Sequence, residues 1–334
     1  MKKGVLLVNL GTPDSPGTGD VRKYLREFLM DGRVIDIPYI PRWLLVNLII
    51  APFRGPKSAK EYQKLWEDRG SPLKFYGEDL QAAVQDQLGS EYKVVLAMRY
   101  QSPSIEAGLQ ELKSAKVNSI KVIPLFPQYA SATTGSVIEE VMRNVGQWQV
   151  IPKLEIVDQF VDNDLFLDTF VENAQEMMKE HDYDHFLFSY HGLPERQIYK
   201  AGISKCQLGS CCEHYGEANK YCYRAQCFET TRLLADRLGL KKEQVTTAFQ
   251  SRLGKDPWIQ PYTEDKLKEL AEQGHKKVLA FSPAFVADCL ETTLEVGETY
   301  QEEFIEAGGE RWDLVPSLNT EQKWIECVTE MSRH

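Results

Sequence analysis

Short apolar runs recur along the chain, and each is followed by turn residues and then by a helical pattern. Apolar runs of this length that alternate with helices are typical of buried parallel strands joined by crossover helices. We therefore expect an α/β protein with parallel sheets. The predicted strands are VLLVNL (5–10), KVVLAM (93–98), IKVIPLF (120–126), HFLFSY (185–190), VTTAFQ (245–250) and KVLAFS (277–282).

The two halves of the chain repeat these segments in the same order. Three matched pairs predict two similar doubly wound, Rossmann-like lobes, which we place at residues 1–160 and 161–334. The second pair sets Arg99 over Arg252, each just past a strand. The pairs are GVLLVNLGTP (4–13) with HFLFSYHGLP (185–194), LAMRYQSP (96–103) with FQSRLGKDP (249–257), and IKVIPLFPQY (120–129) with KKVLAFSPAF (276–285).

The repeat has a consequence for the position of a ligand. In open parallel sheets, ligands bind beyond the carboxyl ends of the strands. Two facing lobes would form a cleft lined by those ends. Leu10 and His191 occupy matching places in the two halves, so we expect them to approach each other from opposite walls.

Two apolar stretches bear on targeting and membranes. The N-terminal run in MKKGVLLVNLGTP is too short for a signal peptide and meets Gly-Thr-Pro-Asp instead of a cleavage site, so we interpret it as the first strand. The stretch IPRWLLVNLIIAPF (40–53) is well short of the roughly 20 residues that span a bilayer. Its length favours a buried helix, but its apolar residues on all sides, with Trp43, leave a surface lip or a lipid-facing segment open.

Composition and charge narrow the classes of function. The chain has 334 residues, of which 43% are hydrophobic, and a formal net charge of −10. This length suffices for two domains with substantial cores. Nucleic-acid binding depends on basic patches, and the sequence contains no dense run of Lys and Arg. We therefore expect no nucleic-acid partner.

His191 is the first candidate for chemistry. It directly follows the strand HFLFSY and precedes the turn Gly-Leu-Pro, which leaves its imidazole at the end of the strand. A proton acceptor or metal ligand is useful there, although a single histidine in a turn is more often satisfied by local hydrogen bonds. The other five histidines have no comparable setting.

Carboxylates form the second candidate group. We predict that SPAFVADCLETTLEVGETYQEEF (282–304) is a helix with one acidic stripe. A solvated face explains the later members best, but Asp288 and Glu291 lie near the carboxyl end of a strand. A histidine on one wall and carboxylates on the other would suit a reaction that moves protons and a divalent cation. The stripe consists of Asp288, Glu291, Glu295, Glu298 and Glu302.

At this point the chain resembles the ferrochelatases, lyases that insert ferrous iron into a porphyrin in the last step of haem synthesis. The resemblance covers nearly the whole chain and follows the family order of motifs. It implies the chelatase-type fold of two similar lobes, with Fe²⁺ and a porphyrin as substrates. The motifs are VNLGTPDSP with VRKYLREFLMDGRVIDIP, GSPL (70–73), MRYQSPSI (98–105), PLFPQYASATTGS (124–136), FSYHGLPERQ (188–197), DPWIQP (256–261) and SPAFVADCLETTLE (282–295).

The resemblance also implies roles for single residues. His191 matches the catalytic histidine, and Glu291, with Asp288 and Glu295 behind it, matches the acidic path. His191 and Glu291 are thus the expected ligands of the iron substrate. The segment 40–53 becomes a lip of the pocket and a peripheral membrane contact. The expected porphyrin-binding residues are Trp258, Phe285, Tyr129, Leu10 and, for a propionate, Arg54.

The chain departs from the family pattern at a few positions. Cys289 stands where some members have a histidine, and Ala130 where serine is common; both affect only the detail of the site. Leu10 stands where coproporphyrin-using members have a tyrosine, which favours protoporphyrin IX as substrate.

Five of the seven cysteines lie in one segment, the cysteine segment (203–227), spaced C-x4-C-C-x9-C-x4-C. Disulfides fit poorly with an odd number of cysteines in a reducing cytosol. Structural zinc is the main alternative, although its sites usually contain C-x2-C knuckles. Iron–sulfur clusters accept the more open C-x4-C spacing. The five are Cys206, Cys211, Cys212, Cys222 and Cys227.

Some ferrochelatases carry a [2Fe-2S] cluster, and one bacterial group resembles this chain in placing the cysteines in an internal segment. The resemblance therefore implies a [2Fe-2S] cluster held by four of the five. Cys211 and Cys212 are adjacent, which makes it unfavourable for both to bind the cluster together, so one of them is a candidate for the cysteine that is not a ligand. The alternative candidate is Cys227, whose QCFETTR context resembles that of cluster-free relatives. Competing interpretations are a chelatase for another divalent metal and an iron–sulfur redox or porphyrin-binding protein. We expect a cytoplasmic protein, and its iron donor is not indicated.

Overall fold

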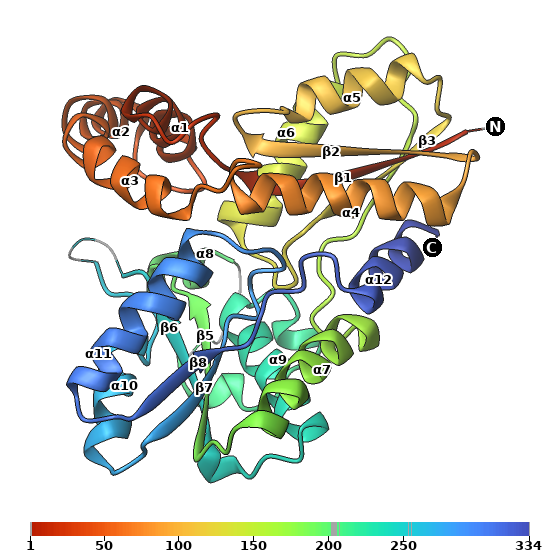
Figure 1. Ribbon diagram of the computed structural model, residues 1–334. Helices are drawn as coiled ribbons and strands as arrows, with labels where there is room; N and C mark the ends of the chain where they lie inside the picture. The colour runs from red at the N-terminus through yellow and green to blue at the C-terminus, as the bar shows by residue number, and fades with distance from the viewer. Residues whose placement is uncertain (1, 202–205, 207, 253, 255, 334) are drawn as a thin grey trace. The chain divides into compact units, whose positions relative to one another are not determined.

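Two four-stranded parallel sheets form the framework of the structure, a computed structural model that describes residues 2–201, 206, 208–252, 254 and 256–333 (Figure 1). The strand orders are β2-β1-β3-β4 and β6-β5-β7-β8. The second order repeats the first with each number raised by four, which confirms two similar α/β lobes. The strands are β1 (Lys3–Gly11), β2 (Tyr92–Tyr100), β3 (Ser119–Pro124), β4 (Lys153–Ile156), β5 (His185–His191), β6 (Val245–Gln250), β7 (Lys277–Phe281) and β8 (Arg311–Leu314).

Each sheet belongs to one compact unit. Unit 1 comprises residues 1–126, 131–158 and 325–334, and unit 2 comprises residues 127–130 and 159–324. The division differs from the predicted boundary at 160 mainly because residues 325–334, at the C-terminus, pack with the first unit.

Helices cover both faces of the sheet in unit 1 (Figure 1). On one face, Leu6 and Val8 of β1 pack with Leu109 of α5 and Val141 of α6. On the other, α4 approaches β2 so closely that a Cβ on Gly77 would lie 3.0 Å from a Leu96 methyl carbon. The helical elements are α1 (Thr18–Met30), α2 (Tyr39–Leu44), α3 (Ala51–Leu65), α4 (Pro72–Leu88), α5 (Ile105–Ser114), α6 (Ser136–Val145) and the π-helical turns η1 (Leu45–Ile50) and η2 (Ser131–Gly135), with α12 (Gln322–Arg333) at the C-terminus.

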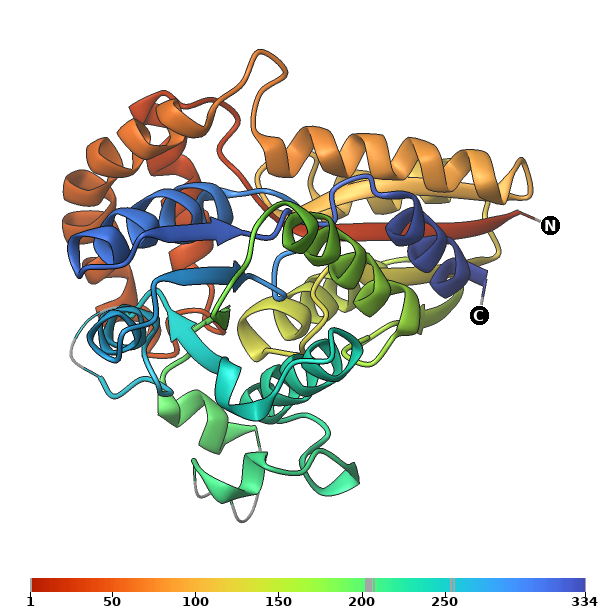
Figure 2. The same cartoon turned by 60° about the horizontal axis from the view of Figure 1, so that its bottom comes forward.

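Unit 2 has the same layers (Figure 2). Leu187 of β5 packs with Leu267 of α10 and Phe304 of α11 on one face, and Phe228 of α9 contacts Phe249 of β6 on the other. The helical elements are α7 (Asp164–Glu180), α8 (Glu195–Lys200), α9 (Tyr223–Arg237), α10 (Thr263–Glu272), α11 (Tyr300–Glu306), the π-helical η6 (Leu290–Thr299) and the 3₁₀ turns η3 (Ser210–Cys212), η4 (Glu217–Asn219) and η5 (Lys242–Gln244).

All six predicted strands are present, and the N-terminal run is β1, as expected. The sequence pattern missed β4 and β8, which have four residues each and lie at the ends of the sheets. Their sequences, KLEI and RWDL, alternate charged and apolar residues, and most of these positions are half-buried. Edge strands of this kind lack the apolar runs that reveal the central strands.

The predicted helix over 282–304 is only partly correct. Residues 282–289 are irregular, and the helical structure begins with η6 at Leu290 and continues into α11. Asp288 thus precedes the helix and does not belong to a helical stripe. η6 also has π-helical i→i+5 bonding, which breaks the three- and four-residue spacing of an α-helical face. Glu298 and Glu302 are exposed, in agreement with a solvated face.

The segment 40–53 does not form a buried helix. It forms α2, η1 and the start of α3, and many of its apolar side chains are exposed. We call this set the apolar patch: Tyr39, Ile40, Trp43, Leu44, Leu48, Ile49 and Phe53, which are between 42% and 74% exposed. None of the helices within the described residues combines the length and hydropathy that a membrane crossing requires.

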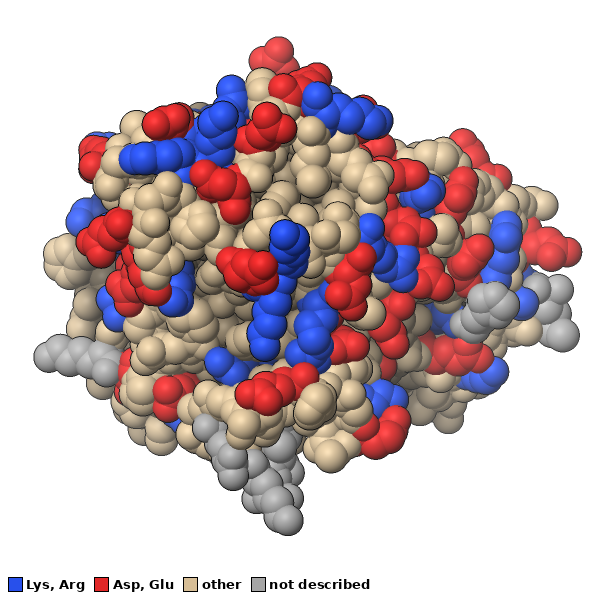
Figure 3. Space-filling model, turned by 90° about the horizontal axis from the view of Figure 1, so that it is seen from below, with Lys and Arg blue, Asp and Glu red and all other residues tan. Residues whose placement is uncertain are grey.

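On the face drawn in Figure 3, acidic and basic side chains lie next to one another. Partly exposed ion pairs of the protein include Arg237 with Asp164 and Asp168, and Arg311 with Asp313. Exposed pairs of this kind contribute little to stability.

Candidate active site

His191 ends β5, an inner strand of the unit 2 sheet, and its side chain is half-buried. Its Nδ1 lies 2.7 Å from the carbonyl oxygen of Gly192. A carbonyl can only accept a hydrogen bond, so Nδ1 carries the proton in the neutral ring and Nε2 keeps its lone pair. The fold thus leaves the remote ring nitrogen able to accept a proton or bind a metal.

The loop that contains Trp258 lies against the turn after His191. Pro194 and Trp258 form an isolated antiparallel bridge, and the N–H of Ile259 donates to the carbonyl of Leu193 at 3.0 Å. The indole and imidazole centroids are 6.4 Å apart. A Cβ on Gly192 would lie 2.8 Å from the Gln250 oxygen and 3.1 Å from the Trp258 ring, so only glycine permits this close approach.

Gln250 connects the strand end to the acidic segment. It ends β6 in register with His191, and its Nε2 donates to Glu295 Oε2 at 3.0 Å. Its own Oε1 accepts from the buried Ser189 hydroxyl at 2.7 Å, which fixes the amide so that its nitrogen faces the carboxylate. Glu295 also accepts from the hydroxyls of Ser251 at 2.7 Å and Tyr300 at 3.0 Å.

The three predicted carboxylates therefore have different settings. Glu295 is held by three donors, and burial together with the neighbouring Glu295 charge raises the pKa of Tyr300. Asp288 accepts from Asn319 Nδ2 at 2.8 Å, and its N–H donates to Asn319 Oδ1 at 3.0 Å. Glu291 lies in the first turn of η6, beside the buried Cys289, whose pKa is raised by burial and then by the Glu291 charge.

The expectation of a histidine on one wall and carboxylates on the other needs correction. His191 ends β5, and Glu291 follows β7, the strand paired with β5 in the same sheet. Both residues therefore belong to unit 2 and to the carboxyl-end side of one sheet.

The predicted porphyrin-binding residues are divided between the units. Trp258, Phe285 and Tyr129 belong to unit 2, whereas Leu10 of β1 and the exposed Arg54 of α3 belong to unit 1. Tyr129 makes an edge contact with Tyr221 of the cysteine segment at 5.5 Å between ring centroids. The cleft between the lobes, and the approach of Leu10 to His191, stay predictions.

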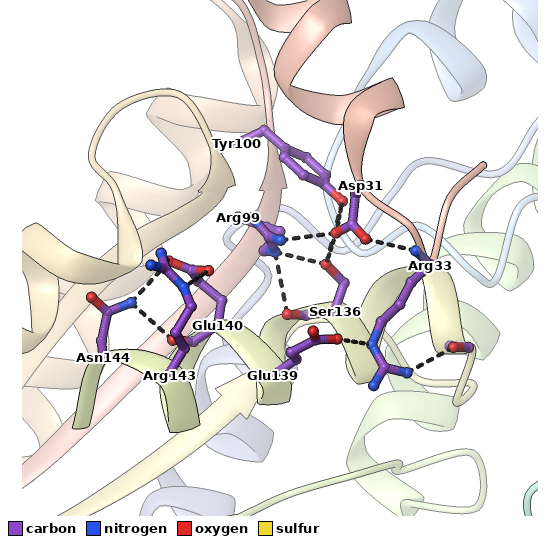
Figure 4. Close-up of polar contacts among 10 residues, drawn as sticks. Asp31, Arg33, Arg99, Tyr100, Ser136, Glu139, Glu140, Arg143 and Asn144 are labelled. Carbon is purple, nitrogen blue, oxygen red and sulfur yellow. Dashed lines mark hydrogen bonds and ion pairs between the residues drawn. The ribbon is translucent and has the colours of Figure 1, made fainter. Parts of the chain in front are cut away.

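In unit 1 a buried polar network occupies the carboxyl end of β2 (Figure 4). Arg99 Nη2 lies 2.8 Å from Asp31 Oδ2, and Arg99 Nε donates to Ser136 Oγ at 2.7 Å. The Tyr100 hydroxyl donates to the same Asp31 oxygen at 2.9 Å. Burial tends to raise the pKa of Asp31, but the donors Ser136 and the Arg33 N–H, with the Arg99 charge, outweigh it and lower that pKa.

Each unit contains an equivalent internal contact at this place in the repeat. Arg99 Nε donates to the Ser136 carbonyl at 3.2 Å, and Gln250 Nε2 lies 3.5 Å from the Glu291 carbonyl. In each case a strand-end side chain reaches the helix that follows the next strand. The structural counterpart of Arg99 is therefore Gln250, and the sequence match of Arg99 with Arg252 is wrong.

A loop of different length explains the mismatch. Met98 N–H donates to the Pro103 carbonyl at 2.6 Å and Phe249 N–H to the Pro261 carbonyl at 2.8 Å, and α5 and α10 each begin two residues after these prolines. Pro103 thus corresponds to Pro261. The second unit has a longer loop, and this loop contains Trp258.

Four thiols of the cysteine segment form two non-covalent pairs. Cys206 contacts Cys211, and Cys212 contacts Cys222; the Sγ atoms of Cys211 and Cys212 are 4.0 Å apart. The hydrogen bond from Cys212, aided by the N–H of Ala225, lowers the pKa of Cys222 despite burial. Cys227 is buried inside α9, and this burial raises its pKa well above the usual value.

All seven cysteines are free thiols. Within the part of the chain that the structure describes, no group of three or more His, Cys, Asp or Glu side chains is arranged to hold a metal ion. The thiol pairs are thus close to one another without enclosing a common position.

Comparisons with known proteins decide the family. The ferrochelatase family model matches residues 2–334. The chain belongs to the ferrochelatase family. It is 45% identical to a Coxiella burnetii ferrochelatase, over 99% of this chain and 93% of that protein. It is 46% identical to a Legionella pneumophila ferrochelatase, over 98% of both chains.

Solved structures of chelatases share the fold at low identity. SirB from Bacillus subtilis with Fe³⁺ matches with a TM-score of 0.53 at 12% identity, over 100% of this chain and 95% of that one. CbiX, described as the terminal enzyme for siroheme biosynthesis in denitrifying bacteria, matches with a TM-score of 0.52 at 12% identity, over 99% and 98%. These likenesses confirm the chelatase-type fold of this ferrochelatase-family chain.

The sequence pattern missed the residues that support the predicted ones. Gln250, Ser251 and Tyr300 hold Glu295, and Tyr223 donates from its hydroxyl to the His191 carbonyl at 2.8 Å. Gln250 could have been found from the sequence, because it is a polar residue at the end of a predicted strand, and His191 was chosen for directly following one. Tyr223 gave no signal, because it lies 32 positions from His191 in the chain.

Proposed function

We propose that the chain inserts Fe²⁺ into protoporphyrin IX to form haem, with His191 accepting protons from the pyrrole nitrogens. Family membership makes the chain an enzyme, a lyase that inserts ferrous iron into a porphyrin. The observation that carries the role of His191 is its Nδ1 contact with the Gly192 carbonyl, which leaves Nε2 available at the end of β5.

The chemistry of metal insertion requires such a base. Two of the four porphyrin nitrogens carry protons, and both protons must leave as the dication enters. In general, a base suits such a proton transfer when its pKa lies near the pH at which the enzyme works, and histidine is the residue most often used. A site that binds a bent macrocycle favours the transition state over the flat substrate, because bending exposes the nitrogen lone pairs.

The three carboxylates are proposed to have different roles in metal insertion. Glu295 already accepts from Gln250, Ser251 and Tyr300, and a carboxylate offers only about four acceptor sites. We therefore assign Glu295 a supporting role. Glu291 is the carboxylate proposed to meet Fe²⁺ or the second proton, and Asp288, held by Asn319, steadies the start of η6.

Aromatic and apolar residues would bind the macrocycle. Trp258 is half-buried beside the His191 ring, which suits it to stack on a porphyrin face, and Phe285 and Tyr129 belong to the same unit. Leu10 and Arg54 would contribute from unit 1, Arg54 by pairing with a propionate. Leu10 favours protoporphyrin IX over coproporphyrin by family resemblance.

The cysteine segment is proposed to bind a [2Fe-2S] cluster. Thiolates are the ligands that such clusters prefer, and the linked thiols are Cys206, Cys211, Cys212 and Cys222. Cys227 is the fifth thiol, enclosed in α9 and in contact with Tyr223. When bound, the cluster would join the segment into one unit. No step of metal insertion depends on it here.

The apolar patch is proposed to contact a membrane surface. Exposed contiguous apolar residues mark interaction sites, and Trp43 with its neighbours could lie at the level of the lipid headgroups. Porphyrins are poorly soluble in water, so delivery from a membrane would suit such a contact.

An anaerobic assay with protoporphyrin IX and Fe²⁺ tests the activity and the role of His191. Visible spectra should show conversion of porphyrin to haem by the parent protein. His191→Ala should lose turnover and still bind porphyrin, which tryptophan quenching would show, whereas His181→Ala, at an exposed position, should match the parent. Normal turnover by His191→Ala would exclude His191 as the base.

The same assay tests the choice of porphyrin. The parent should use protoporphyrin IX in preference to coproporphyrin III, and Leu10→Tyr should shift this preference. A parent that converts coproporphyrin III faster would overturn the inference from Leu10.

A further inference from the structure

Tyr223 connects the cysteine segment to the candidate base. It is the first residue of α9, directly after Cys222, and it is buried. Its hydroxyl donates to the carbonyl oxygen of His191 at 2.8 Å. This bond supports the backbone at the point where β5 ends and the Gly192 turn begins.

Arg224, the next residue, supports the other half of the site. Its Nε and Nη2 donate to the carbonyl of Gln260 at 3.2 and 2.9 Å. Gln260 belongs to the same loop as Trp258, two positions further on. The guanidinium also lies over the Phe228 ring at 4.5 Å, which fixes its orientation. One helical turn therefore holds the backbone on both sides of the His191–Trp258 contact.

Cys222 joins this turn to the other cysteines. It is the N-cap residue of α9, and its carbonyl accepts from the Gln226 N–H at 3.0 Å. Its side chain is buried and contacts Cys212. A displacement of Cys222 must therefore move the first turn of α9, because no flexible residue separates Cys222 from Tyr223.

We propose that Tyr223 and Arg224 are positioning residues for metal insertion, which couple the arrangement of the cysteine segment to the placement of His191 and Trp258. The inference rests on the proposed role of His191. Catalytic groups must be held within a fraction of an ångström of their productive geometry, and a misplacement of about 1 Å can cost a hundredfold in rate. The cysteine segment would thus act on the reaction through backbone position, without touching the porphyrin.

Removal of single hydroxyls tests the coupling. Tyr223→Phe should lower kcat about tenfold with protoporphyrin IX and Fe²⁺, and leave the KM for porphyrin within twofold. The matched control is Tyr190→Phe, which also removes a buried hydroxyl, one that contacts Thr231 at 3.0 Å instead of His191. It should change neither constant more than twofold. An equal loss in both variants, or none in Tyr223→Phe, would overturn the proposal.

A second variant keeps the test valid if Tyr223→Phe does not fold. Arg224→Lys retains the charge but loses the paired donors to Gln260, and should raise the KM for porphyrin about fivefold through the Trp258 loop. Arg237→Lys, at the other end of α9, is the control because its partners are Asp164 and Asp168. An unchanged KM in Arg224→Lys would count against the coupling.

Nitrogen NMR of ¹⁵N-histidine protein separates this proposal from the proposed function. The His191 ring signals are those missing in His191→Ala, and they should shift in Tyr223→Phe and Cys222→Ser but not in Tyr190→Phe or Cys327→Ser. This readout needs no turnover. If His191→Ala proves active, the base assignment fails while the coupling can still hold; unshifted signals in both Tyr223→Phe and Cys222→Ser would refute the coupling itself.

Discussion

The amide nitrogen of Gln250 donates to the carboxylate of Glu295 at 3.0 Å, from a strand end in register with His191. Ser189 donates to the amide oxygen and exchanges a hydrogen bond with Thr263 at 2.8 Å. The orientation of the amide, and with it the position of Glu295, is therefore set by buried groups.

Gln250→Glu should impair catalysis more than folding. It would set a second carboxylate against Glu295, where like charges repel. We expect kcat for iron insertion to fall at least tenfold. Gln273→Glu is the control, since Gln273 is exposed and its amide nitrogen donates to the carboxylate of Glu269 at 3.1 Å. A Gln250→Glu protein with parental kcat would show that Glu295 needs no such support.

Asp31→Asn should destabilise the protein strongly. The side chains of Asp31 and Arg99 are only 8% and 16% exposed, and removal of one partner of a buried pair typically costs about 3 kcal/mol. Asp79→Asn provides a matched comparison, because Asp79 pairs with Arg69 at the surface at 2.7 Å and should cost far less. Urea unfolding of both variants measures the difference, and equal costs would contradict the assigned importance of burial.

His185 should make stability depend on pH between about 4 and 6.5. Burial, followed by the neighbouring His275, lowers the pKa of His185 from 6.5 to about 4; Asp184 opposes this and Lys266 adds to it. Between these pH values the side chain of His185 is protonated in the unfolded chain but neutral in the folded chain. The free energy of unfolding therefore falls by about 3 kcal/mol as the pH falls from 6.5 to 4. Below pH 4 both states are protonated, and the loss is complete.

His185→Gln checks this pH dependence, since glutamine can keep a hydrogen bond to Thr246, the partner of His185 Nε2 at 2.9 Å. The stability difference between parent and variant should change across the window in urea unfolding. His181→Gln, at an exposed position, should preserve the parental profile. A parallel profile for parent and His185→Gln would rule out His185 as the cause.

Single serine variants should identify the ligands of the proposed cluster. Cys206→Ser, Cys211→Ser, Cys212→Ser and Cys222→Ser should each lose the visible bands, iron and acid-labile sulfide of anaerobically purified protein. Cys227→Ser should retain all three, because Cys227 is enclosed within α9. Cys289→Ser serves as the control outside the segment. Loss of the cluster in Cys227→Ser with retention in Cys211→Ser would reverse our choice of ligands, and zinc in place of iron would favour the alternative site.

The apolar patch should bind lipid vesicles. Trp43→Ser with Leu48→Ser should weaken binding to vesicles of phosphatidylcholine and phosphatidylglycerol, measured by cosedimentation, about a hundredfold or more, because each large side chain contributes about 1.5–3 kcal/mol when buried. Val150→Ser with Ile151→Ser removes two side chains of similar exposure, 79% and 58%, elsewhere in unit 1. Equal weakening of vesicle binding by both double variants would show non-specific hydrophobic adsorption instead of a specific contact through the apolar patch.

The sequence pattern predicted the central strands and the repeat because these depend on local apolar runs. It could not reveal β4 and β8, whose four-residue runs mix charge with apolar residues. It misaligned Arg99 with Arg252 because an added loop separates strand from helix in the second half, and only sheet register reveals Gln250 as the counterpart. Likewise the placement of Asp288 before the helix depends on Asn319, which lies 31 positions away.

The position of His191 at the end of a strand was predictable from the sequence, whereas the residues that contact it were not. The groups that hold the site come from distant segments, such as Tyr223 and Ser189, and no local pattern marks a buried hydroxyl as a positioning group. The exposure of 40–53 was similarly hidden, since an apolar run of that length is compatible with both a core and a surface.

The matching places of Arg99 and Gln250 show how duplicated halves can diverge by one side chain. In unit 1 a cation at this place is neutralised by Asp31 and closes the strand end as a fixed joint. In unit 2 a neutral amide there leaves the negative charge of Glu295 without a permanent counterion from that position. The two similar lobes thus differ in the charge held at this strand end, and the replacement of Gln250 by the arginine of unit 1 would place a fixed cation beside Glu295.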